Sequence, residues 1–222
     1  NGYLIVQIYK VGAPVIVVQA IGSLMTYGMN LILAAFGSAQ TVFGIYFKLQ
    51  SFVFMPVFGL NNGMVPIIAY NYGAGHKDRV IKTIKHSVAY GVGIMFVGLL
   101  AMHIFPAQLM RMFDAEESLI AIGAPALETI SLSFVFAGFC IVAGSVFQAL
   151  GNGVYSMIVS VARQMCVLLP VAKLLSLSGE VTLIWWAFPI AELASVLLTS
   201  YFLVRIYRKV ICHIGEPVVQ DA

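Results

Sequence analysis

Hydrophobic residues occur in this chain as long uninterrupted runs, separated by short polar or glycine-rich stretches. A run of about 20 apolar residues can cross a bilayer as a helix, because a helix rises about 1.5 Å per residue and the hydrocarbon core is about 30 Å thick. Six such runs occur, at residues 11–36, 41–72, 87–105, 119–150, 154–177 and 182–207. The pattern therefore predicts an all-α integral membrane protein, built as a bundle of six transmembrane helices.

The segments between and beyond the runs define the expected domain organisation. Residues 1–210 are predicted to form a single six-helix transmembrane lobe, and residues 211–222 are expected to be a disordered cytoplasmic tail. The basic stretch HKDRVIKTIKH is expected to be a hydrophilic connection, and residues 106–118 a short interfacial helix. The chain begins with Asn1 and has no cleavable signal pattern, so we expect it to be a fragment of a longer protein.

The second run is unusual for a segment that only has to sit in lipid. It contains Pro56 and Pro66, with the adjacent amides Asn61 and Asn62 between them. Freed backbone carbonyls and buried amides each cost several kcal/mol in lipid unless they find partners. We therefore expect this run to face other helices or a wet cavity, and both prolines to be places where the helix bends.

Composition supports the membrane class and excludes several others. Hydrophobic residues make up 61% of the chain and charged residues 9%, against about 25% charged in soluble domains. There is no basic tract with interleaved aromatic residues, so nucleic acid is not an expected partner. The three cysteines are far apart, and no nucleophile–base pair, metal-ligand spacing or phosphate-binding loop occurs. Neither an enzyme nor a metal or cofactor site is predicted.

The basic residues are concentrated on one side of the predicted bundle. Six spans place both ends of the chain on the same side, together with the connection after the second run. Eight of the 12 Lys and Arg residues fall there: Lys10, Lys77, Arg79, Lys82, Lys85, Arg205, Arg208 and Lys209. Because cytoplasmic loops are enriched in basic residues, both ends of the chain are predicted to be cytoplasmic.

Four ionisable residues lie within the apolar runs, where charge is expensive and often functional. Glu128 is interpreted either as a proton acceptor or cation ligand, or as a structural carboxylate. Glu192 lies among apolar neighbours, which favours a structural position on a seam between helices. Arg163 pairs with one of these two acids, or else extends to the cytoplasmic surface without a partner. Lys48 either reaches the outer surface or lines a cavity.

Four stretches of the chain are similar to one family of transporters. They are GLNNGMVPIIAYNYGAG in the second run, FQALGNG between the fourth and fifth runs, SVARQMCVLLP in the fifth, and WWAFPIAEL in the sixth. Together they resemble the multidrug and toxic compound extrusion (MATE) family over residues 11–209, and most closely its bacterial subgroup of MepA- and DinF-type transporters. That family has twelve transmembrane helices in two lobes, and this chain resembles the second lobe.

The resemblance implies an antiporter in the plasma (bacterial inner) membrane. It would export organic, often cationic or amphipathic compounds in exchange for H⁺ or Na⁺, with alternating access around a cleft between this lobe and a missing N-terminal lobe. The polar residues expected to face the substrate cavity or hold the lobe together are Gln19, Asn30, Lys48, Asn61, Asn62, Glu128, Gln148, Arg163, Gln164 and Glu192.

This chain differs from part of the family in the acidic residues that would bind the coupling ion. Some subgroups carry acids in the helices that correspond to the first and fourth runs, but Gln19 stands in the middle of the first run and no acid lies near Gly138. The coupling acid is therefore expected in the other lobe. Two other classes stay open: a flippase for a lipid-linked saccharide, which should need a strongly cationic cavity, and a membrane module that transports nothing.

Overall fold

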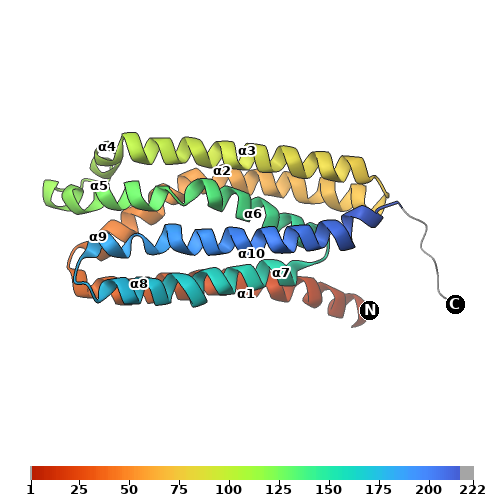
Figure 1. Ribbon diagram of the computed structural model, residues 1–222, viewed down its shortest axis with the longest axis horizontal. Coiled ribbons are helices and arrows are strands. Elements are labelled where there is room, and N and C mark those ends of the chain that lie inside the picture. The colour runs from red at the N-terminus through yellow and green to blue at the C-terminus, as the bar shows by residue number, and fades with distance from the viewer. Residues whose placement is uncertain (1, 216–222) are drawn as a thin grey trace.

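The computed structural model describes the backbone of residues 2–215, with the side chains of Tyr9 and residues 12–215. This part of the chain is almost entirely helical and forms one bundle of long antiparallel helices (Figure 1). The helices are α1 (Gly2–Leu33), η1 (Ala34–Phe36), α2 (Ala39–Gly73), α3 (Lys77–Ile104), α4 (Pro106–Arg111), α5 (Glu117–Ser131), α6 (Phe134–Ala149), α7 (Gly153–Val161), η2 (Ala162–Leu168), α8 (Leu169–Ser176), α9 (Val181–Ile184), α10 (Ala187–Lys209) and η3 (Ile211–His213).

The helices make six passes along the long axis of the bundle. Five stretches are long and apolar enough to cross a membrane, and the bent pair formed by α5 and α6 supplies a sixth. The α2–α3 turn, the α6–α7 turn and the end of α10 lie at one end of the molecule, together with the start of α1 (Figure 1). The predicted all-α, six-span fold is confirmed.

The third span begins ten residues earlier than predicted. The basic stretch expected to be a connection belongs to α3, which starts at Lys77 with Asp78 in its first turn, where a carboxylate favours helix formation. Val80 is fully buried, whereas Arg79, Lys82 and Lys85 are exposed. The segment is therefore an amphipathic first part of a helix, and its many charges concealed its apolar face from a reading of hydropathy alone.

The fourth span is broken where an unbroken helix was predicted. Helices α5 and α6 meet at an angle of 49° across Leu132 and Ser133. The Ser131 hydroxyl donates to the carbonyl of Glu128 at 2.9 Å, and the Ser133 hydroxyl donates to the carbonyl of Ile130 at 2.7 Å. Two serine side chains thus bond to backbone carbonyls near the break, an arrangement that bends helices.

The segment after α10 is ordered as far as the structure describes it, which corrects the expected disordered tail for residues 211–215. Helix η3 packs against the α2–α3 turn, with Ile211 and Ile214 buried. The Lys77 ammonium donates to the carbonyl of Cys212 at 2.8 Å. Residues 216–222 lie outside the described residues. The last span is therefore fastened to the turn that joins the second and third.

A close glycine contact supports this attachment and allows a test. Gly215 has φ +85°, and a Cβ added there would lie 3.0 Å from the carbonyl oxygen of Gly75. We expect Gly215→Val to accelerate amide hydrogen exchange over residues 211–214 by about tenfold, since a β-branched residue is strained at this φ and no space is available. Gly179→Val is the control, because Gly179 has φ +77° but open space around it. Unchanged exchange in Gly215→Val would show that the attachment does not hold the segment.

Candidate functional site

A cavity of about 890 Å³ lies inside the bundle, between α1, α2, α6, the α7–η2 segment and α10. Helix α3, the third span, does not contribute to it. The lining mixes aromatic and aliphatic side chains with amides, hydroxyls and one pair of opposite charges. Ligand-binding pockets typically have volumes of about 300–1,000 Å³ and a mostly apolar lining with a few placed polar groups. The size and the mixture suit a drug-sized organic molecule.

An aromatic cluster forms the end of the cavity near the start of α2. The ring centroids of Tyr46 and Phe188 are 5.8 Å apart, and those of Phe43 and Phe47 are 4.9 Å apart in an edge-on contact. Behind them Trp185 is fully buried, and its ring lies 6.5 Å from that of Phe43. Helices α2 and α10 are thereby joined by packed rings, which give the cavity a rigid apolar end.

The charged pair consists of Arg163 and Glu192. Arg163 Nη1 donates to Glu192 Oε2 at 3.0 Å, with the Arg163 side chain 35% exposed and that of Glu192 5% exposed. Both residues line the cavity, and the carboxylate is the more deeply buried of the two. Of the two partners considered from the sequence, the structure selects Glu192.

The guanidinium group is carried by an irregular part of the fifth span. Residues Ala162–Leu168 form wide π-helical turns between α7 and α8. Pro170 lies two residues after this segment, and its ring would clash with the carbonyl four residues earlier in a regular helix. A wide turn relieves that clash and rotates the side chains before it relative to a regular helix. Such turns occur frequently at functional sites.

Three buried oxygen atoms on the cavity wall lack partners. Asn61 Oδ1, Ser195 Oγ and Thr199 Oγ1 are shielded from solvent and form no hydrogen bond to nitrogen or oxygen in the described part of the chain. Ser195 and Thr199 do lie beside the Cys140 thiol. A buried polar group without a partner costs about 1–3 kcal/mol.

Seven of the ten polar residues predicted from the sequence line this cavity: Gln19, Asn61, Asn62, Gln148, Arg163, Gln164 and Glu192. Gln148 Nε2 also donates to the Ser156 hydroxyl at 3.3 Å, which links α6 to α7. Two amides of the second span, Asn61 and Asn62, thus face the cavity. Pro66 lines the cavity and Pro56 does not, while α2 continues as one helix through both; helix bending at the two prolines stays a prediction.

The remaining three predicted residues lie outside the cavity. Asn30 donates from Nδ2 to the carbonyl of Thr26 at 2.9 Å, within its own helix. Lys48 is exposed, with its ammonium 5.6 Å from the ring centroid of Phe113 in the segment after α4. Glu128 is half-buried on α5, a helix that contributes no lining residue. The direction in which these side chains face was not evident from the sequence.

Sequence reasoning missed the hydroxyls and the thiol beside the ion pair. Glu192, Ser195 and Thr199 are spaced three and four residues apart, which places them on one face of α10. This spacing could have indicated that the three side chains share one face. Serine and threonine are too common in membrane helices, however, for the spacing alone to identify a site. Among the described residues, no group of three or more His, Cys, Asp or Glu side chains could hold a metal ion.

Comparison with known proteins gives consistent matches. The family model MatE matches residues 14–174. The multidrug export protein MepA of Staphylococcus haemolyticus is 26% identical over 204 residues, which are 91% of this chain and 45% of the relative. MepA of Staphylococcus aureus strain N315 is 27% identical, over 86% of this chain and 42% of the relative. The chain thus spans less than half of each relative's length.

Two solved structures have the same fold over nearly the whole chain. The MATE multidrug transporter DinF-BH is 32% identical with a TM-score of 0.81, over 94% of this chain and 47% of that one. The Vibrio cholerae MATE transporter VcmN in its bent form is 17% identical with a TM-score of 0.86, over 97% of this chain and 48% of that one. The latter supports the fold alone.

Proposed function

Because the chain belongs to the MatE family of multidrug efflux transporters, we propose that it forms one six-helix half of a secondary active transporter. The complete protein would export small organic compounds across the plasma membrane in exchange for H⁺ or Na⁺. The observation that carries this proposal is the cavity of about 890 Å³ with a single buried ion pair in its wall. Its mostly apolar lining with a few polar groups suits small organic substrates.

Alternating access requires two halves with the site between them. This chain matches only 45% and 42% of the length of the two MepA relatives, so more than half of each relative lies outside the match. We infer that a second six-helix lobe, N-terminal to this one on the same polypeptide, completes the cleft. Rocking of one lobe against the other would then expose the cleft to each side of the membrane in turn.

The coupling ion is proposed to bind in the other lobe. Among the described residues Glu192 is the one carboxylate that lines the cavity, and Arg163 already neutralises it. A carboxylate that binds H⁺ or Na⁺ during transport must be available to the ion, whereas Glu192 is held by a permanent cation. The pair is therefore assigned to organising the cavity wall, and an unpaired acid elsewhere to coupling.

The distribution of charge supports a cytoplasmic location for both ends of the chain. Lys77, Arg79, Lys82 and Lys85 follow the α2–α3 turn, and Arg205, Arg208 and Lys209 end α10, at the same end of the bundle (Figure 1). The opposite end carries Asp114, Glu116, Glu117 and Glu180. This asymmetry follows the positive-inside rule. A saccharide flippase is not favoured, because Arg163 is the one cation lining the cavity in the described residues.

A pair of matched glycine variants tests the cavity. Gly22 lines it, and the one atom near an added Cβ would be Gln164 Oε1 at 4.0 Å. Gly22→Leu should therefore fold normally but narrow the cavity, and we expect export of a fluorescent organic cation to fall about tenfold. Gly44→Leu is the control, because Gly44 has open space around it and does not line the cavity. Efflux is measured in cells that express the complete transporter, with each ion gradient collapsed in turn.

Two outcomes would contradict the proposal in different ways. Equal export by both variants at equal expression would show that this cavity does not carry substrate. Failure of the unmodified transporter to export any organic cation or amphipathic dye, whatever gradient is imposed, would contradict multidrug antiport itself.

A further inference from the structure

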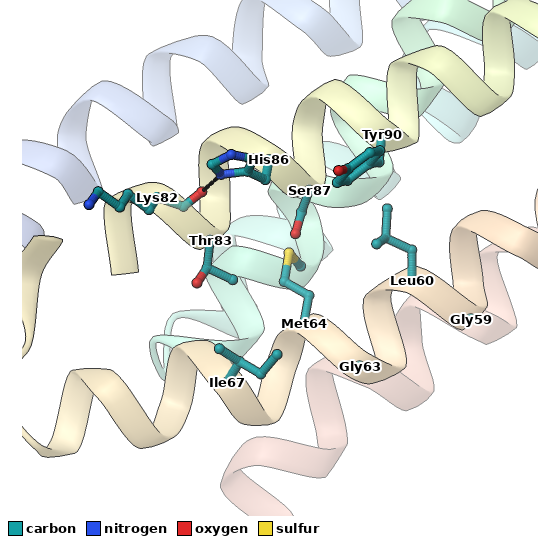
Figure 2. Close-up of a pocket in the computed structure, with 10 residues that line it drawn as sticks. All are labelled: Gly59, Leu60, Gly63, Met64, Ile67, Lys82, Thr83, His86, Ser87 and Tyr90. Carbon is teal, nitrogen blue, oxygen red and sulfur yellow. Dashed lines mark hydrogen bonds between the residues drawn. The ribbon is translucent and has the colours of Figure 1, made fainter. Parts of the chain in front are cut away.

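A second hollow of about 470 Å³ lies on the outer side of the bundle, between α2 and α3 (Figure 2). Helix α2 contributes Gly59, Gly63 and Ile67 to it, spaced four residues apart on one face. The cavity described above is lined instead by Asn61, Asn62 and neighbouring residues, on the other side of the same helix. The two spaces are thus separated by α2, and the outer hollow opens to the surroundings of the bundle.

The α2 side of this groove is unfilled because two of its lining residues are glycines. A Cβ added to Gly59 or Gly63 would meet nothing within 4 Å. Both helices are spans, and Ile67 and Tyr90 on the groove's edges are 50% and 62% exposed. In a membrane, an open apolar channel of this kind on the outer surface of spanning helices contacts acyl chains.

The opposite wall of the groove carries hydroxyl groups and becomes basic toward the α2–α3 turn. Figure 2 shows Tyr90 and Ser87 farther along α3, and His86, Thr83 and Lys82 nearer to its start. His86 Nδ1 lies 2.7 Å from the carbonyl oxygen of Lys82. Since a carbonyl only accepts, Nδ1 carries a proton. The Lys82 ammonium is exposed and forms no ion pair among the described residues.

The position of each group along the helices matches the layers of one leaflet. Lys82 is five residues from the start of α3, or about 7.5 Å at 1.5 Å per residue. Gly63 is ten residues from the end of α2, or about 15 Å, and Gly59 about 21 Å. The basic groups therefore lie nearest the membrane surface, and the bare channel extends below them toward the bilayer centre.

We propose that this groove binds one anionic glycerophospholipid from the leaflet on the side of the α2–α3 turn. The phosphate would lie against Lys82 and His86, and one acyl chain would lie along α2 over Gly63 and Gly59. Basic pockets between transmembrane helices recognise anionic headgroups in this way. The site rests on the membrane-spanning fold alone and does not depend on transport.

Native mass spectrometry of the intact membrane protein tests the site, with phosphatidylglycerol and phosphatidylcholine as probes. We expect the unmodified protein to retain phosphatidylglycerol about tenfold more strongly than phosphatidylcholine. The double variant Lys82→Gln, His86→Gln should remove that preference. Lys85→Gln is the matched control, because Lys85 is an exposed cation on the same helix that does not line the groove, and it should change retention less than about twofold.

The acyl chain is tested separately from the headgroup. Gly63→Leu fills the channel without a clash and should lower retention of phosphatidylglycerol about tenfold, whereas Gly93→Leu, also in open space but outside the groove, should not. Free glycerol phosphate should fail to displace the lipid. Retention that is unchanged in Lys82→Gln, His86→Gln or in Gly63→Leu, or displacement by free glycerol phosphate, would overturn the proposal. The melting temperature of each variant confirms that it is folded.

Discussion

Replacing Arg163 with methionine is expected to lower the free energy of unfolding by about 3–5 kcal/mol at neutral pH. Methionine keeps most of the side-chain volume but leaves the Glu192 carboxylate, which is 5% exposed, without a counter-charge. Removal of one partner of a buried ion pair is costly because the other charge stays desolvated. Denaturation in mixed micelles measures the loss.

Two further variants make the interpretation specific. The double variant Arg163→Met, Glu192→Met should recover to within about 1 kcal/mol of the unmodified protein, since apolar replacement of a whole pair is often neutral. Lys48→Met should cost less than about 1 kcal/mol, because Lys48 is exposed and lies near a ring rather than an acid. A single Arg163→Met variant as stable as the unmodified protein would show that the pair is not desolvated.

The pH dependence of the single variant has a definite sign. An unpaired buried carboxylate is less costly when it takes up a proton, so the folded state of Arg163→Met binds more protons than the unfolded state. Its stability should therefore rise as the pH falls. The double variant lacks the carboxylate and should not show this recovery. Denaturation repeated at about pH 5 and pH 8 distinguishes a lost charge partner from lost packing.

Replacing Gly138 with leucine is the second change for which a large loss is expected. A Cβ at Gly138 would lie 3.0 Å from the carbonyl oxygen of Gly91 and 2.9 Å from Met95 Cγ. Helices α3 and α6 are thus in backbone contact, and membrane helices depend on such close packing for association. Overpacking costs about 1–3 kcal/mol even where side chains can move, and here one obstacle is backbone.

We expect Gly138→Leu to reduce the yield of folded, monodisperse protein several-fold, as measured by size-exclusion chromatography and thermal melting. Helix α6 also carries Cys140 and Gln148 on the cavity wall, so any protein that folds should bind substrate poorly. Gly93→Leu on α3, where an added Cβ meets nothing, should behave like the unmodified protein. If both variants melted at the same temperature, the glycine contact would not be a determinant of packing.

The sequence predicted the number and order of the spans and most of their approximate limits, because each span appears in the sequence as a long apolar run. It placed Arg163 and Glu192 within apolar runs and named each as a candidate partner of the other, and the structure shows that they are paired. It could not give the direction a side chain faces. Asn30 and Asn61 have the same chemistry, yet one bonds within its own helix and the other faces the cavity.

Helix interruptions were the least predictable feature. Bends were expected at Pro56 and Pro66, and α2 continues as one helix through both, whereas the 49° bend between α5 and α6 was not expected. A proline removes one hydrogen bond, and a helix held by its neighbours tolerates that loss. Ser131 and Ser133 act by competing for backbone carbonyls, a tendency that depends on the surrounding packing and is not evident in composition.

The ion pair in the cavity wall also has an electrical consequence. Moving one elementary charge through a membrane potential of 100 mV is worth about 2.3 kcal/mol. Arg163 and Glu192 carry opposite charges 3.0 Å apart, so together they contribute almost nothing to that work when the lobe changes its orientation. In the proposed antiporter, voltage would therefore act on the exported compound and on the exchanged ion rather than on this ion pair.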